Sequence, residues 1–216
     1  MAFPVGITRR NPADAQSPLG PPSHCHASVV LAAGTANQTK VHATKAVLRD
    51  LWIGHIFWVR NVVFAELAGN AAAQKAAENQ VVANAQAIAA SIAPFYGADA
   101  EARFFRLLAG HYGAVKAYLD ATIAGDADKQ SEATAMLLGN ATEIAEFLST
   151  ANPYLPKDAV EGLLQAHGGH HIVQIQQLLA NEFSDEAQTW LEMTQHVYVI
   201  ADATADALAQ QFAERF

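Results

Sequence analysis

The stretches "LLAGHYGAV" at residues 107–115 and "LLQAHGGHHIV" at residues 163–173 repeat one pattern, in which two leucines precede a histidine. Both lie in segments rich in Ala, Leu, Gln and Glu, which favour helices. Leu108 stands three residues before His111, and Val115 stands four residues after it. Positions with this spacing share one face of an α-helix. The two stretches therefore predict helices whose apolar, core-facing side carries a histidine.

Helix stops, rather than hairpin turns, divide the chain from about residue 45 onward. Pro94 with Gly97, and Asn152-Pro153 with Pro156, are expected to end two helices, and Gly125 suits the left-handed position just past a third. Short connections make sequential helices antiparallel neighbours. The sequence thus predicts an all-α, six-helix antiparallel bundle in one domain at 45–216. Its helices are expected near residues 44–69, 71–93, 99–124, 129–151, 157–181 and 184–214.

Composition limits the classes of function. The chain has 216 residues, 51% of them hydrophobic, which is enough for one sizeable core. The net charge is −8 and the 13 Lys and Arg residues are scattered, which argues against a nucleic-acid partner. Arg60 and Glu66 interrupt the best apolar run, so no transmembrane segment is expected. The single cysteine, Cys25, excludes an internal disulfide and a cage of four thiolates.

Residues 1–44 are expected to form a disordered tail or an export-type segment. Five prolines fall within the first 22 residues, which show no apolar periodicity. Arg9 and Arg10 precede "SVVLAAGTA" at residues 28–36, which has the small residues of a cleavage region but a poor hydrophobic centre. Both a cytoplasmic and an exported location remain open.

Histidines recur through the chain in a regular frame. A shift of 56 residues brings Asn84 onto Asn140 and His111 onto His167. A wider pattern follows four histidines, each of which has Leu or Ile twelve residues later, followed by Ala. These histidines are His55, His111, His167 and His196. We interpret the pattern as four histidine-bearing helices built on one template, with an internal pseudo-twofold repeat.

Inward histidines at equivalent positions are candidates for a metal site. An unpaired buried imidazole costs roughly 1–3 kcal/mol, so each needs a metal, a polar side chain or a carbonyl as its partner. His167 and His171 form an i, i+4 pair that can chelate one ion. No Glu stands three residues before any histidine, which argues against a carboxylate-bridged di-iron bundle. Imidazole ligands suit Zn, Cu, Ni or haem iron.

The candidate site therefore has two layers. Its expected metal ligands are His55, His111, His167, His171 and His196. Glu192, Asp120 and Asp202 are possible second-shell acceptors that orient the imidazole rings. Arg60, on an otherwise apolar helix, is expected to pair with an acid such as Asp202.

Several short blocks in a fixed order resemble a family of uncharacterised bacterial all-helical proteins. They are "LRDLWIGHIFWVRN" at 48–61, the "LLAGH" and "LLQAH" segments, "NPYLPKDAVEGLL" at 152–164 and "HVYVIADATADALAQQF" at 196–212. The resemblance spans roughly residues 45–216. Members often carry labels such as glycosyltransferase or acetylglutamate kinase, which the residues here do not support. The resemblance implies a helical fold with repeated histidines and says nothing about a substrate.

Three functional interpretations follow. The first is binding or storage of a transition metal, because no residue is marked as a nucleophile or general base. The second is a structural or interaction protein, possible as a homodimer, whose histidines are hydrogen-bonded core residues. The third is a carrier of an apolar small ligand that uses the aromatic helix at 51–64. The chain has no Walker loop, no Gly-x-Ser-x-Gly motif and no Rossmann fingerprint.

Overall fold

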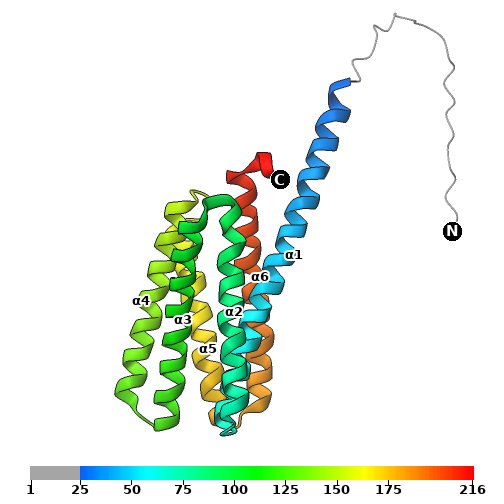
Figure 1. The fold of residues 1–216 in the computed structure, drawn as a ribbon. Coiled ribbons are helices and arrows are strands. Elements are labelled where there is room, and N and C mark those ends of the chain that lie inside the picture. The colour runs from blue at the N-terminus through cyan, green and yellow to red at the C-terminus, as the bar shows by residue number, and fades with distance from the viewer. Residues whose placement is uncertain (1–24) are drawn as a thin grey trace, which may run out of the picture.

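The computed structural model describes residues 25–216, with side chains from residue 38 onward. This part of the chain is all-α, as predicted, and forms six α-helices and a short 3-10 helix (Figure 1). The helices are α1 (Cys25–Leu67), α2 (Ala71–Tyr96), α3 (Ala98–Ala124), α4 (Ala127–Ala151), α5 (Lys157–Leu179), α6 (Phe183–Gln211) and η1 (Ala213–Arg215).

The first helix begins earlier than the sequence predicted. α1 starts at Cys25 rather than near residue 44, because no proline follows Pro22 before the helix ends and the segment is rich in alanine. Figure 1 shows the first part of α1 extending past the other helices. Leu48 is its first described buried residue. Of the predicted tail, residues 1–24 lie outside the described residues, as do the side chains of the export-like segment at 28–36.

Two helix ends test the predicted stops. Gly125 follows α3 in the left-handed conformation, with φ of 67°, as expected. Pro94 does not end α2, which continues to Tyr96. A proline inside a helix removes one hydrogen bond and its ring crowds the carbonyl four residues earlier, so it weakens or kinks the helix but does not by itself end it. Gly97, the other residue of the predicted stop, ends the helix, with φ of 86°, and its N–H donates to the carbonyl of Ala93.

The helices form a closed ring. Each packs against the next in sequence, and α6 packs back against α1. The alternate helices α1, α3 and α5 also contact one another, so these three meet inside the ring. Side chains on α1, α3 and α5 can therefore converge on one place in the core.

The apolar face predicted around the histidines is confirmed. The residues three positions before and four positions after each repeated histidine are all buried. They are Trp52, Leu108, Leu164 and Met193 before it, and Val59, Val115, His171 and Ile200 after it. The helical periodicity of the sequence is thus sufficient to identify the core-facing side of four helices.

Ion pairs set the register between α1 and α6. Arg49 pairs with Asp202, and Arg60 pairs with Glu186. Residue numbers rise along α1 as they fall along α6, so these two helices run in opposite directions. Arg60 therefore pairs with an acid of α6, as predicted, but Asp202 is the wrong acid, because it lies level with Arg49, three turns away along α1.

The Arg60 side chain lies in a network of polar contacts in the core. It donates two hydrogen bonds of 2.6 Å each to the carboxylate of Glu186, which is 2% exposed. Gln174 of α5 donates a third hydrogen bond of 2.8 Å to the same carboxylate. The guanidinium also lies over the rings of Phe64 and Trp190. The buried negative charge of Glu186 is thus fully compensated.

None of the helices in the described part of the chain has both the length and the apolar character needed to cross a membrane.

Candidate metal centre

Four histidines meet where the alternate helices converge. His55 comes from α1, His111 from α3, and His167 and His171 from α5. One ring nitrogen from each lies within 4.8 Å of those of the other three. Each of the four residues is 5% exposed or less. We call these four residues the histidine cluster.

The two histidines from α5 already have the separation of metal ligands. The Nε2 atoms of His167 and His171 are 3.2 Å apart. In a tetrahedral zinc site with Zn–N bonds of about 2.0–2.1 Å, neighbouring nitrogens are about 3.4 Å apart. The i, i+4 spacing on one helix face produces this fit. All four nitrogens lie within 4.8 Å of one another, so the other two side chains must move closer to complete a four-nitrogen site.

Several nitrogens of the histidine cluster have no hydrogen-bond partner among the described residues. They are Nε2 of His55, both nitrogens of His111 and Nδ1 of His167. Buried polar atoms are almost always hydrogen-bonded, since leaving one unpaired costs about 1–3 kcal/mol. The cluster concentrates such atoms in one place. It has the donor atoms of a metal site, and hydrogen bonds such as that between Nε2 of His167 and Nε2 of His171 occupy only some of its nitrogens.

Burial keeps these imidazoles neutral. It lowers the pKa of His55 from 6.5 to about 3 and that of His111 from 6.5 to about 4. Burial, together with the neighbouring rings of the cluster, also places the pKa values of His167 and His171 well below the usual value. A neutral imidazole has one nitrogen with a free lone pair. At neutral pH each histidine can therefore bind a metal without first losing a proton.

The metal-free protein is expected to lose stability in acid. Below pH 6.5 the unfolded chain takes up protons on these histidines, whereas the folded chain does not until about pH 4 at His111 and about pH 3 at His55. Each pKa unit corresponds to about 1.4 kcal/mol, so several kcal/mol should be lost as the pH falls from 6.5 to about 4. Urea unfolding at a series of pH values measures this loss. His111→Leu should show a shallower dependence, and equal slopes would contradict the expectation.

His196 is not in the histidine cluster. Its Nε2 lies 2.8 Å from the backbone carbonyl of Leu163, and its ring centroid is 6.4 Å from that of His167. The sequence template treated it as equivalent to the other three histidines of the repeat. In the structure, His196 instead contacts a backbone carbonyl, as Asn84 and Asn140 do at the equivalent positions.

Three hydrogen bonds between neighbouring helices share one geometry. Asn84 donates to the carbonyl of Leu51, Asn140 donates to that of Leu107, and His196 contacts that of Leu163. Each joins residues 33 positions apart, and successive bonds are separated by the 56-residue shift of the sequence repeat. A second step of this shift would have placed His196 with Asn84 and Asn140 from sequence alone.

Glycines beside two cluster histidines make room for the asparagines. A Cβ on Gly54 would lie 2.9 Å from Nδ2 of Asn84, and one on Gly110 would lie 3.1 Å from Nδ2 of Asn140. The second step of the shift leads from Gly110 to Ala166, where the partner is His196. Small residues next to His55 and His111 thus allow the paired helices to approach closely.

Gly168 has a similar packing role. A Cβ there would lie 2.9 Å from Cδ2 of Leu137 on α4, whereas one on Gly169 would meet nothing within 4 Å. Close packing therefore explains the first glycine of the "HGGHH" segment. Nothing in the structure explains the second.

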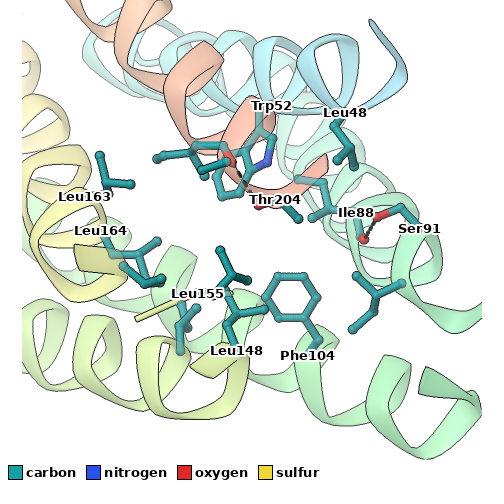
Figure 2. Close-up of a pocket in the computed structure, with 15 residues that line it drawn as sticks. Leu48, Trp52, Ile88, Ser91, Phe104, Leu148, Leu155, Leu163, Leu164 and Thr204 are labelled. Carbon is teal, nitrogen blue, oxygen red and sulfur yellow. Dashed lines mark hydrogen bonds between the residues drawn. The ribbon is translucent and has the colours of Figure 1, made fainter. Parts of the chain in front are cut away.

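Trp52 separates the histidine cluster from an apolar cavity. Its ring makes edge contacts with the rings of His55 and His167, at centroid distances of 5.9 and 5.8 Å. Trp52 also lines the cavity, with Leu48, Phe104 and Leu164 among its other walls (Figure 2). The free volume is about 40 Å³. This space can hold a few water-sized molecules, but not a macrocycle such as haem.

The cavity offers a ligand little polar contact. Its hydroxyl groups belong to Ser91 and Thr204, and each donates a hydrogen bond to a carbonyl of its own helix, that of Ile88 or Ile200 (Figure 2). Apolar cavities of this kind tend to remain dry. The carrier interpretation therefore has an apolar space, but it is small and is lined by residues of all six helices rather than lying between α1 and α6.

The acids proposed as second-shell groups have other partners. Asp202 accepts from Arg49, Asp120 accepts from Lys116, and exposed Glu192 accepts from Gln188. No hydrogen bond joins any of them to the histidine cluster in the described residues. Arg60 likewise binds Glu186 rather than a histidine.

Comparison with protein-family models, with curated proteins and with solved structures found no match to this chain.

Proposed function

We propose that the protein binds one transition-metal ion through the histidine cluster, and that it serves in metal binding or storage rather than catalysis. One observation carries the proposal: four buried imidazoles place a nitrogen each within 4.8 Å of one another. Nitrogens on three of these rings have no hydrogen-bond partner among the described residues. A bound ion would supply a partner to Nε2 of His55 and to one nitrogen of His111, which have none otherwise among the described residues.

The ligand set favours a small ion with affinity for nitrogen. Imidazole suits Zn, Cu and Ni, whereas Mg and Ca prefer oxygen ligands. Haem does not fit, because the rings of His167 and His171 are only 4.6 Å apart and the neighbouring cavity has a free volume of about 40 Å³. We therefore propose Zn²⁺, Cu²⁺ or Ni²⁺ as the bound ion.

Four protein ligands leave a tetrahedral ion without an open position. Structural zinc sites have four protein ligands, whereas catalytic zinc sites keep one position for water or substrate. All four ligands are buried, so solvent does not replace one of them readily. This closed ligand set is the reason for proposing binding or storage.

The ligands leave the charge of the ion uncompensated. All four are neutral imidazoles, and the carboxylate of Glu186, which is buried, is held by Arg60 and Gln174. An uncompensated charge in an apolar core is costly, so we expect weaker binding than at a site with thiolate ligands. Moderate affinity is compatible with storage and release.

A repeated helix pair accounts for the origin of the site. In place of the pseudo-twofold repeat expected from the sequence, we infer three repeats of 56 residues, each consisting of an odd-numbered helix and the even-numbered helix after it. His55, His111 and His167 occupy equivalent positions on the odd-numbered helices, and His171 adds a ligand that the first two repeats lack. The resemblance to the all-helical family implies that its members carry histidines at the positions of His55, His111, His167 and His196.

Equilibrium dialysis tests the proposal. Metal-free protein is dialysed separately against Zn²⁺, Cu²⁺ and Ni²⁺, and bound metal is counted by elemental analysis. We expect about one ion per chain for at least one metal, since the cluster forms a single site. Protein that folds normally and retains none of the three would contradict the proposal and favour core histidines of a structural or interaction protein.

A further inference from the structure

The histidine cluster is enclosed, so an ion needs a route to reach it. Each of its residues is 5% exposed or less. His170 and His196 lie beside it and are only partly buried. The ring of His196 is 6.4 Å from that of His167 and nearly parallel to it, at 7°. His196 therefore adjoins the cluster at His167, and both residues are more exposed than the cluster itself.

The hydrogen bond of His196 sets which of its nitrogens can bind an ion. A carbonyl oxygen only accepts hydrogen bonds, so the Nε2 that lies 2.8 Å from the Leu163 carbonyl must carry the proton. The lone pair then resides on Nδ1. Metal-binding histidines commonly donate their other N–H to a backbone carbonyl, which holds the ring in place. His196 thus has the hydrogen bond of a metal ligand without belonging to the cluster.

His170 supplies a second nitrogen at this position. Its ring centroid is 5.1 Å from that of His196. Its Nδ1 is buried and has no hydrogen-bond partner among the described residues. Burial lowers the pKa of His170, and the negative charge of Glu192 acts in the opposite direction. An acid on the exposed side of the pair would attract a cation from solvent.

We propose that His170 and His196 form a second, shallower cation site through which a divalent transition metal reaches the histidine cluster. The inference rests on the proposed function. A hydrated ion exchanges water molecules for the imidazole nitrogens of the pair. It then passes to His167, the cluster residue nearest to His196, as each remaining water is replaced by a histidine. No redox step is involved.

The rate of metal uptake tests this role. Metal-free protein is mixed with Zn²⁺ in a stopped-flow instrument, and a chromophoric chelator reports free Zn²⁺. The test variant combines His170→Ala, His196→Asn and Ala166→Gly. Asparagine keeps the hydrogen bond to Leu163, and glycine gives it the space that Gly110 gives Asn140. The matched control combines His196→Asn and Ala166→Gly only, and retains His170.

The triple variant is expected to take up Zn²⁺ at least about tenfold more slowly, with the number of bound ions and the equilibrium affinity within about threefold of the wild type. The control variant should take up Zn²⁺ at a rate between those of the wild type and the triple variant. Circular dichroism and thermal unfolding establish that all the variants fold.

Two results would overturn the inference. One is an unchanged uptake rate in the triple variant. The other is an equal loss of rate and affinity, which would make His196 part of the main site. A wild-type protein that takes up no Zn²⁺ at all would instead contradict the proposed function, and the shallower site with it.

Discussion

Replacing His167 with alanine is expected to abolish tight metal binding. His167 is central to the histidine cluster, because its ring contacts those of His55, His111 and His171. Loss of a direct ligand should exceed the roughly 10–100-fold loss in affinity that follows removal of a second-shell group. Isothermal titration of metal-free protein with Zn²⁺ measures the change.

His42→Ala provides the matched control. His42 lies on α1 but is exposed, so its replacement should leave Zn²⁺ affinity unchanged. If the cluster histidines were purely structural, His167→Ala would lower the free energy of unfolding without affecting any metal. The metal interpretation is contradicted if the variant binds Zn²⁺ as tightly as the wild type.

Replacing Arg60 with methionine is expected to cause the largest loss of stability. The change leaves the carboxylate of Glu186, which is 2% exposed, with Gln174 as its remaining hydrogen-bond donor. Breaking a buried ion pair from one side costs roughly 3–5 kcal/mol, because the other charge is left uncompensated. Urea unfolding at neutral pH measures the loss.

Two further variants separate charge from packing. Adding Glu186→Met to Arg60→Met should restore most of the stability, since apolar replacements of a whole buried pair are often neutral. Arg49→Met breaks the more exposed pair with Asp202 and should have a much smaller effect. If the double variant is no more stable than Arg60→Met, an uncompensated charge is not the reason for the loss.

Periodicity explains why so much of the fold was predictable. The apolar spacing around His111 and His167 identified a helix face that local sequence alone determines. Stops such as Gly125 act through backbone conformation and are equally local. Pro94 shows the limit, because a helix can continue past a proline by one turn when a later residue supplies the end.

Contacts between helices were less predictable. The pairing of Arg60 with Glu186 depends on how far α6 is displaced along α1, and no local pattern fixes that distance. The position of His196, which lies on α6, also depends on this displacement. The sequence did contain the relevant clue, since one further step of the 56-residue shift leads from Asn140 to His196.

The histidine cluster itself was only partly foreseen. His55, His111, His167 and His171 were candidates because they share the apolar face. Three of them, His55, His111 and His167, recur every 56 residues. Their convergence required α1, α3 and α5 to meet inside the ring, a property of the tertiary structure. Trp52, which contacts two of the rings, belonged to an aromatic stripe typical of any core.

X-ray absorption spectroscopy of the protein loaded with one equivalent of Zn²⁺ tests the central claim most directly. It counts the atoms bound to the metal and measures their distances. The account predicts four nitrogen ligands at about 2.0–2.1 Å with the scattering pattern of imidazole rings. A spectrum of mainly oxygen ligands, or one showing two imidazoles or fewer, would place the ion elsewhere and contradict the account.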